Sequence, residues 1–169
     1  KNDSNKVNEW KAKYNCIADM KEVEPADDVL EMIPNIDMFL SPSNTENSFI
    51  WSRCLTKMRE DMIDNCDIRI CAGGKHSGYK GKMPGVLEEV LIASEKKKPI
   101  YLFGGFGGIT SSICKIINGT EVEELTEEWQ IKYNVGYADL LRFTETKDSS
   151  KSVNYKEICE KLRSLKLNN

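Results

Sequence analysis

Histidine is almost missing from this chain, and basic residues are not in excess. The 169 residues contain one histidine, His76, and none of the six cysteines belongs to a Cys-x-x-Cys pair. Zinc sites are built from clusters of these residues, so we expect no metal. There are 24 Lys and Arg residues against 27 Asp and Glu, which gives a net charge of -3. A chain with this charge has no basic footprint for nucleic acid and no polybasic membrane anchor.

Long apolar runs are also absent. No stretch approaches the roughly 20 apolar residues of a membrane-spanning helix, and no signal peptide is visible. The scattered cysteines favour reduced thiols in a cytoplasmic protein. A length of 169 residues with 40% hydrophobic content suits one domain, residues 1–169, with a core of its own. Because the first residue is Lys1 rather than methionine, we expect this domain to be a fragment of a larger protein.

The central part of the chain, residues 66–108, reads as strand, glycine-rich loop, helix, strand and second glycine-rich loop. An apolar run through Ile70 stops at Gly73-Gly74, as a buried parallel strand does. Pro84 suits a helix start, and apolar residues then recur at helical spacing as far as three lysines at 96–98. The run 100–103 is the next strand. The pattern predicts a βαβ unit, and hence an α/β fold with a Rossmann-like parallel sheet flanked by helices.

The flanking segments are predicted to be mostly helical. Helices are expected within residues 1–20 and 27–33, from a capping box at Ser43 and Glu46 to about Asp64, and over 109–118, from 126 onward and over 155–165. Residues 36–40 suggest a short strand. The helix that ends near Asp64 should bury an apolar stripe made of Trp51, Leu55, Met58 and Met62.

One expected element has no counterpart at the start of the chain. A nucleotide-binding α/β domain usually opens with a strand that leads into its own glycine-rich turn. Residues 1–35 supply neither. Either the first βα unit is missing, or the domain is a reduced version of the fold.

The loop between the first strand and the helix is suited to binding an anion. Its glycines let backbone N–H groups approach a ligand closely, the following helix start is electropositive, and lysines add positive charge. Glu88 and Glu89 follow at the end of the first helical turn, where a carboxylate can accept hydrogen bonds from ribose hydroxyls. The alternative is a solvated loop whose two glutamates are simply favoured by the helix dipole. The candidate ligand residues here are Gly73, Gly74, Lys75, Lys80, Lys82, Pro84, Gly85, Glu88 and Glu89.

Two further groups remain ambiguous on the residues alone. Arg59 flanks the apolar stripe of the preceding helix, and it is either a structural clamp or a ligand-facing cation, with the clamp favoured. The glycines of the second loop serve either ligand contact or close backbone packing. That loop supplies Gly104, Gly105, Phe106 and Gly107. The helix after it offers candidate caps or phosphate contacts at Thr110, Ser111 and Ser112.

The motifs at residues 58–59, 69–75, 78–89 and 98–108 resemble the SLOG superfamily, the Rossmann-like domains related to the DprA and LOG proteins. In particular, they are similar to the SLOG domains associated with Sir2 and TIR proteins in Thoeris-type bacterial antiphage defence. The resemblance covers residues 50–115 well and the flanks poorly. It implies a sensor rather than a catalyst, because such domains bind cyclic ADP-ribose isomers made by TIR proteins and switch an attached effector.

Carried over by motif, the resemblance implies that Arg59 and Lys75 hold a pyrophosphate while Glu88 or Glu89 holds a ribose hydroxyl. It strengthens the ligand-facing hypothesis for Arg59, because a bidentate arginine beside a lysine suits a diphosphate. It also implies that the domain has no resident cofactor and binds a cyclic ADP-ribose isomer or an ADP-ribose-like or NAD-like nucleotide. The implied partners are a Sir2-like or TIR-like effector domain, in the same or a partner protein, and further copies of the chain in a homo-oligomer.

An enzymatic alternative comes from the same superfamily. LOG-type enzymes cleave the glycosidic bond of a nucleotide with an arginine and a glutamate. Their Pro-Gly-Gly-x-Gly-Thr-x-x-Glu signature is echoed only in part by residues 84–89, which lack the Gly-Thr dipeptide. The alternative is therefore a nucleotide N-glycosidase (phosphoribohydrolase) or nucleoside ribosyltransferase that uses Glu88, Glu89 and Arg59. A third hypothesis is an assembly domain whose loops bind nothing.

Overall fold

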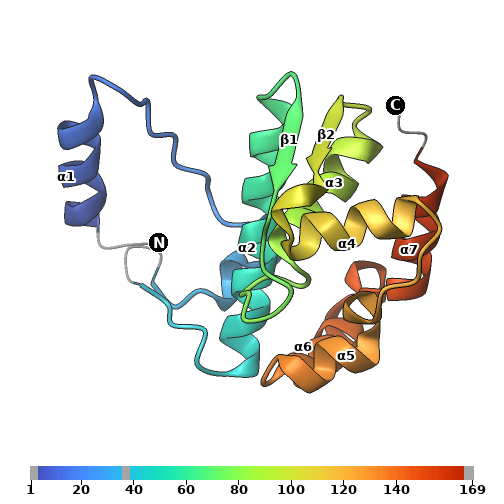
Figure 1. The fold of residues 1–169 in the computed structure, drawn as a ribbon. Coiled ribbons are helices and arrows are strands. Elements are labelled where there is room, and N and C mark those ends of the chain that lie inside the picture. Colours follow the sequence, from blue (N-terminus) through green and yellow to red (C-terminus); the bar gives the residue numbers. More distant parts are fainter. Residues whose placement is uncertain (1–3, 36–38, 166–169) are drawn as a thin grey trace.

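The computed structural model describes residues 4–35 and 39–165, and helices flank a small parallel sheet (Figure 1). The first elements are α1 (Ser4–Tyr14), the 3-10 helix η1 (Asp27–Met32) and α2 (Thr45–Asp64). The central unit is β1 (Arg69–Ala72), α3 (Gly85–Glu95) and β2 (Ile100–Phe103). The chain continues through η2 (Gly104–Phe106), α4 (Gly108–Ile117), η3 (Glu123–Leu125), α5 (Glu127–Tyr133), α6 (Tyr137–Lys147), η4 (Ser149–Lys151) and α7 (Tyr155–Ser164). Within the described ranges, no helix has the length and apolar character needed to cross a membrane.

The predicted βαβ unit is confirmed. β1 and β2 pair in parallel, with Ile70 opposite Tyr101 and Ala72 opposite Phe103, so both strands end at the same edge of the sheet. Cys71 is buried on the inner face of the sheet, where α3 and α4 pack against both strands and against each other. The sheet has two strands in the part of the chain that the structure describes. The fold is therefore α/β and Rossmann-like, and it lacks units of a full doubly wound sheet.

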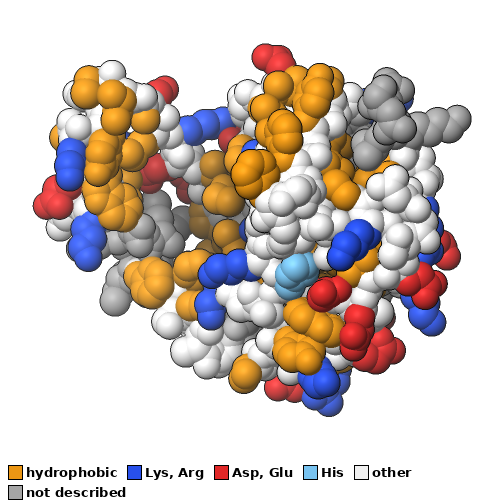
Figure 2. Space-filling model, viewed as in Figure 1, with side chains coloured by type: hydrophobic (Ala, Val, Ile, Leu, Met, Phe, Trp, Pro, Cys, Tyr) orange, Lys and Arg blue, Asp and Glu red, His pale blue; other side chains and the backbone are white. Residues whose placement is uncertain are grey.

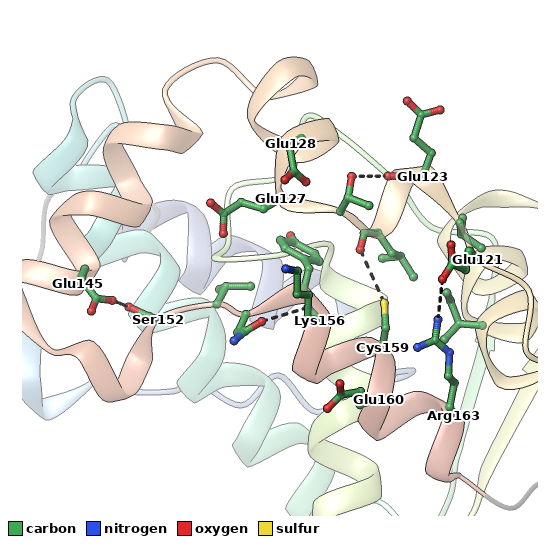
Figure 3. Close-up of a pocket in the computed structure, with 17 residues that line it drawn as sticks. Glu121, Glu123, Glu127, Glu128, Glu145, Ser152, Lys156, Cys159, Glu160 and Arg163 are labelled. Carbon is green, nitrogen blue, oxygen red and sulfur yellow. Dashed lines mark hydrogen bonds and ion pairs between the residues drawn. The ribbon is translucent and has the colours of Figure 1, made fainter.

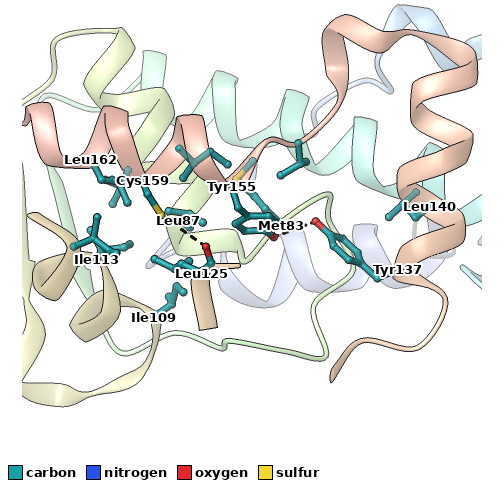
Figure 4. Close-up of a cluster of buried hydrophobic side chains, with 14 of the residues drawn as sticks. Met83, Leu87, Ile109, Ile113, Leu125, Tyr137, Leu140, Tyr155, Cys159 and Leu162 are labelled. Atoms are coloured by element: carbon teal, nitrogen blue, oxygen red, sulfur yellow. Dashed lines mark hydrogen bonds between the residues drawn. The ribbon is translucent and has the colours of Figure 1, made fainter. Parts of the chain in front are cut away.

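The main core joins α3, α4 and α7 (Figure 4). Leu87 of α3, Ile109 and Ile113 of α4, and Leu162 of α7 are fully buried. The apolar faces that the sequence predicts for these three helices thus point toward one another. Burial of each such side chain is worth about 1.5–3 kcal/mol, so this cluster fixes the helices that position both glycine-rich loops.

Two predictions for α2 are wrong. The side chain of Asn44, not Ser43, caps the helix by accepting a hydrogen bond from the amide of Asn47 at 2.8 Å. The predicted stripe is also out of phase, since Met58 is exposed. The buried face lies one position further along and includes polar groups, because it meets a buried carboxylate of α3. The buried residues of α2 are Phe49, Ile50, Ser52, Thr56, Arg59 and Ile63.

Some of the remaining predicted elements are confirmed, and others are not. The expected helices within residues 1–20 and 27–33 are α1 and η1, the latter a 3-10 helix. The strand expected over 36–40 falls largely on 36–38, outside the described residues, and Phe39 and Leu40 are not in a strand. The sequence pattern did not predict α6. The structure contains no disulfide among the six cysteines, all of which lie in the described residues.

Candidate functional site

The two glycine-rich loops meet at the edge where β1 and β2 end. The amide of Ile109 donates to the carbonyl oxygen of Gly74 at 3.1 Å, and the amide of Thr110 donates to that of Gly73 at 2.9 Å. A side chain at Gly108 has no room, since a Cβ there would lie 2.3 Å from the Gly74 oxygen. The φ of Gly108 is also positive, at +62°. At this contact the glycines allow close backbone packing, one of the two roles that the sequence left open.

In this contact the first backbone amides of α4 donate hydrogen bonds to carbonyl groups of the protein itself. The candidate phosphate contacts on α4 are engaged there too, because the buried Thr110 hydroxyl donates to the Gly73 oxygen at 2.9 Å. The hydroxyl of Ser112, also buried, lies 2.9 Å from Nε2 of His76. The tip of the second loop is open by contrast, with Phe106 77% exposed. A ligand at this edge would therefore meet the loop tip rather than the first turn of α4.

Helix α5 holds the first loop in place. Gln130, which is fully buried, donates to the carbonyl of His76 at 3.2 Å and accepts from the hydroxyl of Tyr79 at 2.6 Å. Asn134 accepts a hydrogen bond from the amide of Gly78 at 2.7 Å. A loop fixed in this way has less conformational entropy to lose on binding a ligand. Sequence reasoning missed both amides, because a Gln and an Asn on a short helix give no signal of a distant loop.

Three tyrosines lie behind the same loop. The hydroxyl of Tyr137 donates to the carbonyl of Lys82 at 2.6 Å and lies 3.0 Å from the hydroxyl of Tyr155. The ring of Tyr79 packs edge-on against Tyr137, with ring centroids 5.9 Å apart. Burial raises the pKa of Tyr79 to about 12, and it also raises the pKa of Tyr137 and of Tyr155. These hydroxyls stay neutral at physiological pH and tie the loop to α6 and α7.

The lysines of the first loop occupy different environments. Lys75 and Lys80 are exposed. The side chain of Lys82 is only 23% exposed, and its Nζ lies 3.6 Å from Oε1 of Glu88. Lys82 is therefore partly neutralised by a carboxylate, whereas Lys75 and Lys80 present their charge to solvent, where an anionic ligand would meet it.

Arg59 and Glu88 form an ion pair between α2 and α3. The Arg59 guanidinium donates to Oε2 of Glu88 at 2.5 Å, and the hydroxyl of Thr56 donates to Oε1 at 2.5 Å. Arg59 is 8% exposed and Glu88 is 2% exposed. A Cβ on Gly85 would lie 2.7 Å from the guanidinium, so a glycine lets the arginine lie against the start of α3. Both oxygens of Glu88 are thus engaged within the protein, and Arg59 makes the contacts of a structural clamp.

Glu89 lies beside two arginines. It forms an ion pair with Arg69 of β1 through Oε2, and its Oε1 lies 3.7 Å from Nε of Arg59. The Nε atoms of both arginines are buried and have no hydrogen-bond partner among the described residues. Glu89 is consequently held at the junction of α2, α3 and β1, beside two buried guanidinium N–H groups that lack a hydrogen-bond partner among the described residues.

A cavity of about 940 Å³ lies elsewhere, between the segment after α4, the start of α5 and helix α7 (Figure 3). Its lining includes six glutamates against one lysine and one arginine. Figure 3 shows Glu127 and Glu128 on the α5 side and Lys156, Glu160 and Arg163 along α7. None of the predicted ligand residues lines this cavity. Its acidic rim would repel a diphosphate, so size alone does not make it the nucleotide site.

The predicted ligand residues fall into two sets. The first, which we call the ion-pair cluster, is largely buried and comprises Arg59, Lys82, Glu88 and Glu89, with Pro84 and Gly85 beside it. The second, which we call the loop edge, comprises Gly73, Gly74, Lys75, Lys80, Gly104, Gly105, Phe106 and Gly107. Across residues 4–35 and 39–165, no group of three or more His, Cys, Asp or Glu side chains is placed to hold a metal ion.

Comparison with known proteins gives a match at the level of a family. The family model described as SLOG cluster2 matches residues 2–169, nearly the whole chain. No curated protein and no solved structure matches the sequence.

Proposed function

The chain belongs to the SLOG cluster2 family, and from this premise we propose that its loop edge binds a nucleotide. Membership of this family suggests a nucleotide-related function. The observation that carries the proposal is the meeting of two glycine-rich loops at the carboxyl ends of β1 and β2, where open α/β sheets bind their ligands. The charge that faces solvent there comes from Lys75 and Lys80, which suits a diphosphate.

Each part of a nucleotide has a candidate partner at this edge or in the ion-pair cluster at the start of α3. Lys75 and Lys80, with the backbone amides of the first loop, would hold the diphosphate. Phe106 is 77% exposed and offers a flat surface on which a base can stack. Glu89 is the better candidate for a ribose hydroxyl, because both oxygens of Glu88 already accept hydrogen bonds. In this proposal Arg59 acts on the ligand through the carboxylates that it positions.

The nucleotide that we propose is a cyclic ADP-ribose isomer or a related ADP-ribose-like or NAD-like molecule. The domain would then be a sensor that regulates an attached or partner effector of the Sir2 or TIR type in antiphage defence. The resemblance of residues 58–59, 69–75, 78–89 and 98–108 to such sensors supports this finer proposal. The loop also contacts α5 through Gln130 and Asn134, which gives a ligand-driven change at the loop a direct route to the C-terminal helices.

The enzymatic alternative draws on the closeness of Arg59 to two glutamates. Cleavage of a glycosidic bond needs a carboxylate that reaches the sugar. Glu88 is buried with both oxygens engaged, and Glu89 is paired with arginine, so the sensor remains our preferred proposal. Incubation with nucleoside monophosphates, followed by chromatography for free base, separates the two. Base release that is lost in Glu89→Gln would favour the enzyme.

Isothermal titration calorimetry tests the sensor proposal directly. We expect ADP-ribose or a cyclic ADP-ribose isomer to bind with micromolar affinity, and a Lys75→Ala, Lys80→Ala double variant to bind at least about tenfold more weakly. A matched control removes two exposed lysines of α7, Lys156 and Lys161, and should leave the affinity unchanged. If ADP-ribose, the cyclic isomers and NAD all fail to bind below roughly millimolar concentration, about 4 kcal/mol, the proposal is wrong.

A further inference from the structure

The outer face of the sheet is apolar and uncovered in the described part of the chain. Its four large side chains, which we call the bare face, lie on the same side as the small exposed Ala72 and alternate with residues that face the core. They are Ile68, Ile70, Tyr101 and Phe103, with exposed fractions of 45%, 53%, 55% and 49%. Figure 2 shows hydrophobic side chains gathered over β1 and β2. Parallel sheets are almost always covered on both faces, so this surface requires a partner.

Helix α1, in turn, leaves part of its apolar stripe exposed. Its apolar residues Val7, Trp10 and Tyr14 recur at helical spacing, and Trp10 is 42% exposed. Figure 1 shows α1 standing apart from the body of the molecule at the end of an extended segment. A separate helix of 11 residues is marginal in water, so α1 needs a surface to pack on.

The connection after α1 separates it from its own sheet. Lys21 forms an ion pair with Asp61 of α2 at 3.0 Å, and Ala26 is buried, so the chain is fixed to α2 from that point. In Figure 1, α1 stands to the left of α2, and α2 runs behind β1. The hydrophobic side chains of α1 and those over β1 and β2 are both visible on the same side of the molecule in Figure 2. Two copies that meet through this side can each offer α1 to the sheet of the other.

We propose that α1 of one copy covers the bare face of a second copy, and the reverse, in a twofold dimer. Exchange of a terminal element between identical chains is a low-cost route to such dimers. A half-exposed aromatic side chain presents on the order of 100 Å², so the bare face presents on the order of 400 Å². Two reciprocal contacts, each with a similar area from α1, would bury on the order of 1,600 Å², which is within the range of specific interfaces.

The chemistry of the two surfaces suits this pairing. The four residues of the bare face carry no charge, and neither does the apolar stripe of α1. These residues therefore bring no like charges together where α1 meets the bare face, and we expect the association to depend little on salt. Helix on sheet is also the arrangement by which α/β domains cover a parallel sheet.

Sedimentation equilibrium at micromolar concentration tests the proposal on the full chain. The expected mass is twice the 19.2 kDa of one chain. Trp10→Glu and Tyr101→Glu should each weaken the dimer at least about 100-fold, as removal of an aromatic anchor does. Tyr133→Glu is the matched control, because Tyr133 is 49% exposed on α5, away from both surfaces, and it should leave the dimer intact. Far-ultraviolet circular dichroism checks that each variant folds.

Mixing the two weakened variants separates exchange from other modes of association. A dimer of one Trp10→Glu chain and one Tyr101→Glu chain has one intact contact, so the mixture should associate more tightly than either variant alone. Absence of this rescue, or a monomeric unaltered chain, overturns the proposal. A dimer that Tyr101→Glu breaks and Trp10→Glu leaves intact also overturns it, in favour of two bare faces packed together. None of these measurements involves a nucleotide, so they do not depend on the proposed function.

Discussion

Replacement of Glu88 by glutamine should destabilise the protein far more than the same change at the adjacent Glu89. Glu88→Gln keeps the shape of the side chain and the hydrogen bond from Thr56, but it leaves the guanidinium of Arg59 buried without its carboxylate. Breaking a buried ion pair by removing one partner costs about 3–5 kcal/mol. The carboxylate of Glu89, 3.7 Å from Nε of Arg59, recovers part of this. We therefore expect a loss of about 3 kcal/mol.

Glu89→Gln is the matched control. The Glu89 side chain is 13% exposed, and its partner Arg69 is 26% exposed, so water compensates for more of the loss. We expect about 1 kcal/mol. Urea denaturation with linear extrapolation measures both values, and thermal unfolding of Glu88→Gln should begin roughly 6–12 °C lower than in the unaltered protein.

A double variant tests the physical reason. Arg59→Met with Glu88→Met removes both charges and fills the space with apolar groups, which often restores stability to near the original value. Thr56 keeps a partner in this variant, because its hydroxyl also donates to the carbonyl of Ser52. The double variant should therefore be more stable than Glu88→Gln alone. A loss in Glu88→Gln that is no greater than in Glu89→Gln would show that the buried ion pair is not what holds α2 against α3.

The remaining predictions concern the loops and their supports. Gly108→Ala should cost about 3 kcal/mol in urea denaturation, because its Cβ would strike the Gly74 oxygen and its φ is positive, whereas Gly105→Ala, in open space, should change stability by about 0.5 kcal/mol. Gln130→Leu should cost about 2–4 kcal/mol and speed hydrogen exchange of the first loop, since buried partners lose their hydrogen bonds; unchanged exchange there would contradict the anchoring role of α5. The raised pKa of Tyr79 means that the folded protein resists its ionisation, so this contribution to stability is present below about pH 10 and is lost as pH rises to about 12. Urea denaturation across this range should show a smaller loss in Tyr79→Phe, and an equal loss in both proteins would refute the assignment.

The sequence predicted the central unit well because its signals are local. Apolar runs that end at glycine pairs, with a proline between them, depend on neighbouring residues alone, and β1, α3 and β2 follow that pattern. The stripe of α2 failed for the opposite reason. Hydrophobicity alone predicted that the stripe containing Met58 would be buried. The buried side of α2 is instead set by Arg59 and Thr56, which bind the carboxylate of Glu88 on α3.

Part of the candidate site also could not be predicted from neighbouring residues in the sequence. The glycines, lysines and glutamates could be chosen from their spacing. Their division into a buried ion-pair cluster and an exposed loop edge depends on burial, which spacing does not reveal. Gln130 and Asn134 were missed because the loop that they hold lies more than 50 residues earlier in the chain.

The central claim, that the loop edge binds a nucleotide, is tested most directly by two-dimensional NMR of the backbone amides during a titration with ADP-ribose. The account predicts that the amide signals of Gly74, Gly78, Gly105 and Gly107 shift and saturate together. Gly119, which lies outside both loops, should stay in place and serve as the internal control. If the loop glycines do not move at millimolar ADP-ribose, or if the shifts fall instead on residues around the acidic cavity, the account is contradicted.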